Sequence, residues 1–372
     1  MNGTFRVGNL FGIPFNVHPS WFLILGLVTW TYGNGLAAAF PGLFGPLPWI
    51  LGLVTGLLLF ASVLAHELGH SFVAISQGIE VKSINLFLFG GLAQLEKESK
   101  TPAEAFWIAI AGPIVSLLLF GIFTAIGVGT PISGPLAAIL GLLASINLAL
   151  ALFNLIPGLP LDGGNILKAA VWKITGNPYK GIIFASRVGQ IFGWIAIASG
   201  LLPLVLYGST ANFWNLLVGW FLLQNAGQSA QSATVQDKLA GLTAEDAVIP
   251  NSPIVSADIS LRKFANDYVI GQNRWRKFLV TDEDGQLVGA IAVDDLKTVS
   301  LELWPQIKVT ELTRSIDESK TVKSDRSLLE VATLLEEQSL TQLPVIRHNG
   351  VLVGLLEKTS IIKLLQGQAQ PA

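Results

Sequence analysis

The chain of 372 residues is 51% hydrophobic and 13% charged, with a formal net charge of −2 at pH 7. This near-neutral charge gives no support for nucleic-acid binding, which depends on a basic surface. The chain has no cysteine, which excludes disulfides and thiolate zinc sites. Of its 48 Asp, Glu, Lys and Arg residues, 14 lie in residues 1–235 and the other 34 in residues 236–372. The sequence therefore predicts a membrane half followed by a soluble half.

The first half contains apolar stretches of the length that crosses a bilayer, which is about 20 residues. We expect six spans, at roughly 17–38, 48–76, 103–128, 134–156, 186–207 and 212–226, the last being short. The N-terminus does not have the pattern of a removable signal peptide. Six spans place both termini on one side, and the basic residues of this half fall on that side. Because basic loops stay inside, we expect a multi-pass protein of the cell membrane with both termini in the cytoplasm.

The second predicted span carries the motif His66-Glu67-x-x-His70. Helical positions four apart share a face, so His66 and His70 can bind one Zn²⁺ through an imidazole each. Glu67 lies beside them, where it can act as a general base toward water. A charged residue at bilayer depth is costly, so this glutamate alone is a functional-site hypothesis. The alternative is a pair of histidines that only link helices, which does not explain the carboxylate between them.

A catalytic zinc ion usually has three protein ligands and one open position for water. Asp162 is the only carboxylate between Glu104 and Asp237. It follows a stretch interrupted by two prolines and several glycines, and irregular backbone at membrane depth is tolerated where it lines a wet cavity. These features favour Asp162 as the third ligand. The alternative is an interfacial aspartate that caps the helix after it.

Four motifs together resemble the site-2 protease family of intramembrane zinc metalloproteases. The resemblance covers roughly residues 5–226, and its two-part metal motif is specific. The matching residues are, in chain order, His66-Glu67-x-x-His70, Phe89-Gly90-Gly91, Ala111-Gly112-Pro113 and Asn154-x-x-Pro157-x-x-x-x-Asp162-Gly163.

This resemblance implies that His66, His70 and Asp162 ligate Zn²⁺ and that Glu67 is the catalytic base. It also implies that Asn154 contacts the substrate or steadies the developing oxyanion. A plain hydrogen bond between helices is the alternative role for Asn154.

The family also has a membrane-associated β-hairpin that pairs with an unwound substrate. In this chain, strand-like apolar stretches flank Gly90 and Gly91 within residues 80–97, as is typical of a hairpin. An open edge there can take up an extended peptide by strand addition. We therefore expect Gly90 and Gly91 to bind substrate, the alternative being a surface loop with a short hairpin.

The soluble half carries an internal repeat, because the segment that begins at Phe278 aligns with the one that begins at Leu343 at a constant offset of 65. Each unit is predicted as strand, Asp-Gly or Asn-Gly turn, strand and helix. This duplication resembles the tandem cystathionine-β-synthase (CBS) domain pair. Such pairs often dimerise and often sense adenosine nucleotides.

The nucleotide signature of that family is poorly matched. Its four polar positions are occupied here by Ala292, Asp295, Glu357 and Ser360, and only Asp295 keeps the expected residue type. An aspartate at this position can also simply cap its helix. We therefore expect a structural or homodimerising module rather than a sensor of adenosine nucleotides.

The expected fold is a multi-pass α-helical membrane domain of about six spans with a membrane-associated β-hairpin, followed by an α/β tandem CBS module. Its expected parts are a transmembrane metalloprotease domain over residues 1–226, a polar linker over 227–236, and CBS repeats over 237–300 and 301–372.

The function that we expect is that of an intramembrane zinc metalloprotease. It would hydrolyse a peptide bond in or near the transmembrane segment of a membrane-protein substrate, as in regulated intramembrane proteolysis. The alternatives are a membrane zinc protease that acts on cytoplasmic-face or misfolded chains, a CBS-gated channel or transporter, and an inactive scaffold. Nearly charge-free spans disfavour the channel, and the presence of all four catalytic positions disfavours the scaffold. The expected partners are the substrate, the lipid bilayer and a second copy of the chain.

Overall fold

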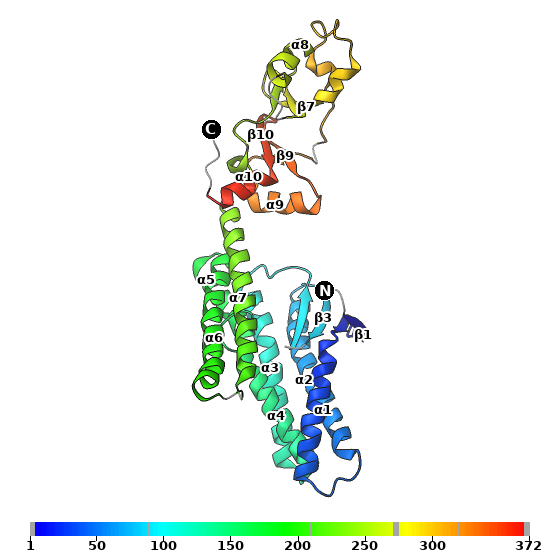
Figure 1. The fold of residues 1–372 in the computed structure, drawn as a ribbon, viewed down its shortest axis with the longest axis vertical. Coiled ribbons are helices and arrows are strands. Elements are labelled where there is room, and N and C mark those ends of the chain that lie inside the picture. The colour runs from blue at the N-terminus through cyan, green and yellow to red at the C-terminus, as the bar shows by residue number, and fades with distance from the viewer. Residues whose placement is uncertain are drawn as a thin grey trace. The chain divides into compact units, whose positions relative to one another are not determined.

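The computed structural model describes residues 4–87, 90–208, 210, 212–270, 275–317 and 320–367 (Figure 1). The chain forms two compact units, Met1–Ala233 and Thr234–Ala372. The boundary between them falls inside one helix, α7 (Phe213–Ala240). The segment expected as a linker, residues 227–236, is therefore helical.

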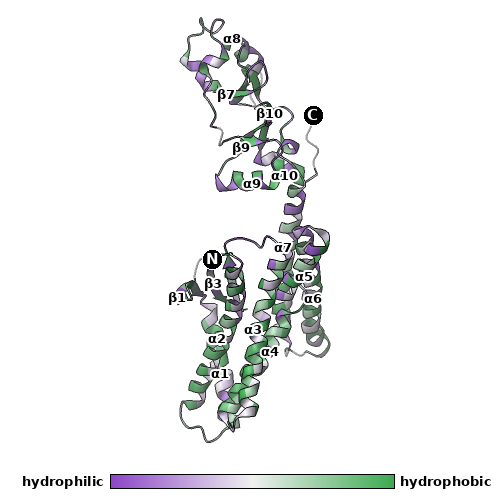
Figure 2. Cartoon of the chain, turned by 180° about the vertical axis from the view of Figure 1, so that it is seen from behind, coloured by the Kyte–Doolittle hydropathy of each residue, from purple (hydrophilic) through white to green (hydrophobic). Residues whose placement is uncertain are grey.

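Five helices of the first unit are long and apolar enough to cross a membrane, counted over the described residues. They are α1 (Ser20–Ala39), α2 (Leu47–Ser76), α3 (Pro102–Gly129), α4 (Pro135–Asn154) and α6 (Pro178–Tyr207). Each corresponds to one of the first five predicted spans. Hydrophobic residues predominate along these helices (Figure 2), and many of their side chains are exposed, such as Leu23, Leu118 and Leu202. Apolar surface of this extent is typical of helices that face lipid.

The sixth predicted span, residues 212–226, does not meet the same criteria. It forms the first part of α7, whose apolar stretch ends at Leu223 and is shorter than the ~20 residues that a span needs. This part of α7 nevertheless packs closely on α6. A Cβ atom added at Gly193 would lie 2.8 Å from Cγ of Leu223, and one added at Gly219 would lie 2.7 Å from the carbonyl oxygen of Gly193. Such close approach at small residues is typical of membrane helix pairs.

The helix boundaries follow local sequence signals. Thr101 precedes the first residue of α3, and its hydroxyl accepts a hydrogen bond from the backbone N–H of Glu104. Asn177 does the same for α6, accepting from the N–H groups of Tyr179 and Lys180. Both helices begin with proline, which suits a first helical turn because its missing N–H has no intrahelical partner there.

A four-stranded sheet accompanies these helices, in the order β1-β2-β3-β4. Its strands are β1 (Phe5–Leu10), β2 (Ile13–Val17), β3 (Val81–Phe87) and β4 (Gly90–Leu95). Strands β3 and β4 form the predicted hairpin, and β2 runs parallel to β3. Leu88 and Phe89, between the hairpin strands, lie outside the described residues. Apolar side chains of β2 and β3 pack against Ala74 of α2, which fixes the sheet beside that helix.

The second unit contains two three-stranded sheets of the same topology. The first consists of β5 (Ile254–Ser256), β6 (Lys277–Thr281) and β7 (Leu287–Ala292), and the second of β8 (Val322–Lys323), β9 (Gln342–Ile346) and β10 (Leu352–Glu357). In each sheet the first strand is parallel to the second, and the second is antiparallel to the third. An offset of 65 carries the bounds of β6 onto β9 and those of β7 onto β10. The predicted internal repeat is thus confirmed.

The described part of this unit also contains the helices α8 (Leu261–Phe264), α9 (Leu328–Glu337) and α10 (Lys358–Leu365). The two repeats contact each other at their hairpin turns. The N–H of Leu287 donates to the carbonyl of Gly350, and the N–H of Leu352 donates to the carbonyl of Gly285. Both glycines have positive φ, as these tight turns require.

Candidate metal centre

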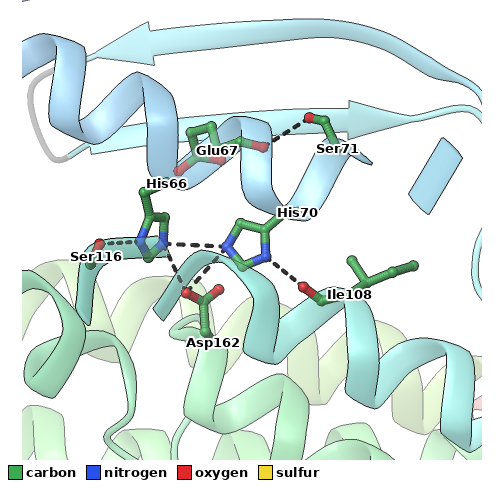
Figure 3. Close-up of polar contacts among 7 residues, drawn as sticks. All are labelled: His66, Glu67, His70, Ser71, Ile108, Ser116 and Asp162. Atoms are coloured by element: carbon green, nitrogen blue, oxygen red, sulfur yellow. Dashed lines mark hydrogen bonds and ion pairs between the residues drawn. The ribbon is translucent and has the colours of Figure 1, made fainter. Parts of the chain in front are cut away.

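The two histidines and the glutamate of the first motif lie on the unbroken helix α2, and all three are buried. His66 and His70 are one turn apart, and both imidazoles point toward the same place (Figure 3). Their Nε2 atoms are 3.3 Å apart. The helix geometry therefore brings the two imidazoles to a common point, as the four-residue spacing predicts.

An irregular loop between two helices brings Asp162 to the same place. Helix α4 ends at Asn154, and Asp162 is the first residue of helix α5 (Asp162–Thr175). The loop between them is held against α6, since the N–H of Leu159 donates to the carbonyl of Ala185. The residue that precedes α5 is Leu161, which makes no side-chain cap. The carboxylate of Asp162 points at the histidines instead of capping its helix (Figure 3).

Three donor atoms form a nearly equilateral triangle. Oδ2 of Asp162 lies 3.1 Å from Nε2 of His66 and 3.3 Å from Nε2 of His70, and the two nitrogens are 3.3 Å apart. Donors held about 2.0–2.1 Å from a tetrahedral Zn²⁺ stand about 3.3–3.4 Å from one another. Two imidazoles and one carboxylate are also a usual ligand set of catalytic zinc, with the fourth position open to water. The residues present therefore fit zinc in both geometry and chemistry.

Each imidazole is also held through its other ring nitrogen. Nδ1 of His70 lies 2.6 Å from the carbonyl oxygen of Ile108, and Nδ1 of His66 lies 2.9 Å from Oγ of Ser116. A carbonyl can only accept, so Nδ1 of His70 carries the hydrogen and its Nε2 presents a lone pair. Such outer hydrogen bonds orient metal-binding histidines. Neither Ile108 nor Ser116 was predicted from the sequence.

Glycines allow α3 to approach this close to α2. A Cβ atom added at Gly112 would lie 2.6 Å from Nε2 of His66 and even closer to Nε2 of His70. A Cβ atom added at Gly69 of α2 would lie 3.0 Å from the carbonyl oxygen of Ala111. The space beside the donor triangle is therefore available only because position 112 has no side chain.

Glu67 contacts the sheet and is not part of the triangle. Its carboxylate lies beside the backbone N–H of Ala93 in β4. A Cβ atom added at Gly91 would lie 2.9 Å from Oε1 of Glu67. Gly91, predicted to bind substrate, is thus adjacent to the predicted base, and Gly90 is the first residue of the same strand.

The two asparagines of α4 differ. Asn147 is fully buried and links α4 to α2, because its Nδ2 donates to Oγ of Ser62 (3.1 Å) and to the carbonyl of Leu143 (2.8 Å). Asn154 is the half-buried last residue of α4. Within the described part of the chain, its side-chain amide has no hydrogen-bond partner, so the structure does not join Asn154 to the donor triangle.

Comparison with known proteins agrees with this site. The chain matches peptidase family M50 over residues 54–134 and 128–196, and the CBS domain over residues 309–367. It is 61% identical to sll0528 of Synechocystis sp., over 99% of this chain and 97% of that protein. It is 32% identical to Rip3 of Mycobacterium tuberculosis, over 98% of this chain and 93% of that protein. Both relatives are named as zinc metalloproteases.

A site-2 protease structure from Methanocaldococcus jannaschii is 32% identical and covers 61% of this chain and 95% of its own, with a TM-score of 0.45. The relatives that align over nearly the whole chain establish the enzyme class and the zinc cofactor. The chain therefore belongs to peptidase family M50, the site-2 protease family of membrane zinc metalloproteases, and carries a C-terminal CBS domain.

Proposed function

We propose that this protein is an intramembrane protease that cleaves a peptide bond within or beside the transmembrane segment of a membrane-protein substrate. The observation that supports this proposal is the position of the donor triangle. It is built from α2 and Asp162 among helices long and apolar enough to cross a bilayer, and His66 and His70 are buried. A hydrolytic site in such surroundings is suited to substrates that arrive through lipid.

Each site residue has a separate role in this proposal. His66, His70 and Asp162 hold the zinc ion, which when bound supplies Lewis acidity and lowers the pKa of a coordinated water to about 7. Glu67 accepts the proton of the attacking water and passes it to the amine that leaves. Asn154, whose amide is free of other partners in the described residues, donates to the developing oxyanion.

Strand β4 supplies the binding edge for an unwound substrate. The N–H of His18 donates to the carbonyl of Leu86, so the backbone groups of Leu86 face β2. Leu86 is the antiparallel partner of Gly91. Because the backbone groups of Leu86 face β2, the two residues form a non-hydrogen-bonded pair, and the backbone groups of Gly91 face away from β3. The free edge of β4 at Gly91 and Ala93 therefore lies on the side of Glu67. An extended peptide that adds to this edge is brought next to the base.

We place the cut nearer the cytoplasmic leaflet. Helix α2 ends at Ser76, with Gln77 after it. With a rise of 1.5 Å per residue, His66 lies about 15 Å inside that end. Both termini and the second unit are placed in the cytoplasm in this proposal, because the basic residues of the first half fall on the same side.

The CBS module serves as a structural or dimerising element in this proposal. Asp295 accepts hydrogen bonds from the N–H of Ala292 and from Arg314, so its carboxylate is already used within the CBS module. Ser360 accepts from the N–H of Glu357 and donates to the carbonyl of Ala247. A cleft of about 440 Å³ lies between the repeats, lined by residues of both, among them Lys277, Leu279 and Leu355. Calorimetric titration of the full-length protein with ATP, ADP and AMP should give no binding heat, and a fitted stoichiometry would overturn this assignment.

The main test compares wild type with Glu67→Gln on a panel of single-span substrates in detergent, with an unfolded soluble protein as a separate substrate. Mass spectrometry locates each cut. We expect wild type to cut in or beside the spans and to leave the soluble protein intact, and the variant to cut neither. Cleavage of only the soluble protein would instead favour a membrane protease that removes misfolded chains.

A further inference from the structure

Helix α3 contacts both imidazoles through three positions on one face. These positions are Ile108, Gly112 and Ser116, spaced four residues apart, which is the spacing that keeps helical residues in line. The carbonyl of Ile108 is bonded to His70 and the hydroxyl of Ser116 to His66. Between them, the missing side chain of Gly112 leaves room for the two Nε2 atoms. Helix α3 therefore acts as the support against which both rings are set.

The two outer hydrogen bonds are chemically different. Ile108 offers a backbone carbonyl, which fixes the hydrogen of His70 on Nδ1 and cannot be removed by substitution of a side chain. Ser116 offers a hydroxyl, which can donate or accept, so the ring of His66 is held in either tautomer. Ser116 is fully buried, and in the described part of the chain the ring of His66 is the only hydrogen-bond partner of its hydroxyl. The hydroxyl is therefore not committed to the carbonyl of its own helix, the usual partner of a serine in a span.

We infer that Ser116 is a positioning residue for the metal site. It accepts the Nδ1 hydrogen of His66, which leaves the Nε2 lone pair directed at the point shared with His70 and Asp162. Without this hydroxyl, a buried Nδ1–H has no acceptor, and the ring loses the contact that keeps its Nε2 atom 3.1 Å from Oδ2 of Asp162. Removal of an outer partner of this kind typically weakens metal affinity by about 10- to 100-fold. This inference rests on the proposed role of His66 as a ligand.

The chain contains a matched control. Ser186 on α6 is also fully buried, but among the described residues its Oγ has no hydrogen-bond partner. Ser116→Ala and Ser186→Ala therefore remove the same atom from equally buried positions, and only the first removes a contact to a predicted ligand. The apparent zinc Kd of each full-length variant is measured by dialysis in detergent against buffers of fixed free zinc, followed by elemental analysis. We expect the Kd of Ser116→Ala to rise about 10- to 100-fold and that of Ser186→Ala to stay within about twofold.

A second measurement needs no substitution at Ser116. The protein has only four histidines, so ¹⁵N labelling of histidine gives few ring nitrogen signals. The pair of ring nitrogen signals that is missing from the spectrum of His66→Gln belongs to His66. In the zinc-loaded wild type, Nδ1 of His66 should carry hydrogen. An Nδ1 without hydrogen in that form, or equal zinc affinities of the two serine variants, overturns the inference. Neither measurement uses a substrate, so failure of the proteolysis proposal does not affect them.

Discussion

The two units of the chain use buried polar side chains differently. In the second unit, Asp295 accepts hydrogen bonds from the backbone N–H of Ala292 and from Arg314, and Ser360 donates to a backbone carbonyl. In the membrane unit, the outer nitrogens of His66 and His70 are held by α3, and their inner nitrogens converge on the carboxylate of Asp162. Buried polar groups that satisfy one another locally indicate a structural role, whereas those whose lone pairs converge on one point indicate a metal site.

The largest effect is expected from removal of the Asp162 carboxylate, on which the two histidines converge. Asp162→Ala removes one corner of the donor triangle and should abolish both bound zinc and peptide hydrolysis. Elemental analysis of gently purified protein, together with the cleavage assay, measures both. Full zinc occupancy in this variant would show that the triangle is not the metal site.

Glu67→Gln should separate chemistry from metal binding. Because Glu67 is assigned as a base and not as a ligand, zinc content should equal that of wild type, while kcat should fall by about 10²- to 10⁴-fold. Parallel measurement of zinc stoichiometry and of turnover on one single-span substrate checks this. Loss of zinc from Glu67→Gln would contradict the assignment of roles.

Gly112→Ala tests whether the space beside the two imidazoles is needed. The added methyl group would lie 2.6 Å from Nε2 of His66, so one of the neighbours must move. Overpacking typically costs about 1–3 kcal/mol, which is about a 5- to 150-fold loss if it falls on zinc affinity.

The matched control for this prediction is Gly121→Ala on the same helix, where nothing lies within 4 Å of the added atom. Zinc affinity there should be unchanged. Equal affinities in the two variants would mean that α2 and α3 can separate without disturbing the site.

The smallest effect is expected in the second unit. Asp295→Ala removes the hydrogen bonds to Ala292 and Arg314 and should lower the free energy of unfolding by about 0.5–2 kcal/mol. Zinc content should not change. The neighbouring variant Asp294→Ala removes only an exposed pair with Lys297 and should leave the midpoint of the same thermal unfolding experiment unchanged. A change in zinc content in Asp295→Ala would contradict its purely local role.

The features that could be predicted from sequence are those with a period or a motif. Five apolar spans, the hairpin around Gly90 and the internal repeat all follow from residue patterns. The spacing of His66 and His70 on one helix also predicts that their rings meet. Asp162 could be singled out because carboxylates are scarce in the first half of the chain.

Other features could not be predicted, for physical reasons. The contact from Ile108 is made by a backbone carbonyl, which has no residue-type signature, and a serine such as Ser116 usually bonds to its own helix. Strands β1 and β2 are short and lie next to a long apolar span that dominates any hydropathy pattern. Residues 227–236 have the composition of a linker, yet their alanines and glutamines are adequate helix formers and α7 continues through them.

The position of the Glu67 carboxylate beside the backbone N–H of Ala93 has a consequence for the resting enzyme. One amide hydrogen serves one strong acceptor at a time, so a peptide that pairs with β4 at Ala93, as we propose, would compete with the Glu67 carboxylate for that donor. Substrate binding would then release the carboxylate. The activity of the base would in this way depend on the presence of a peptide to cleave.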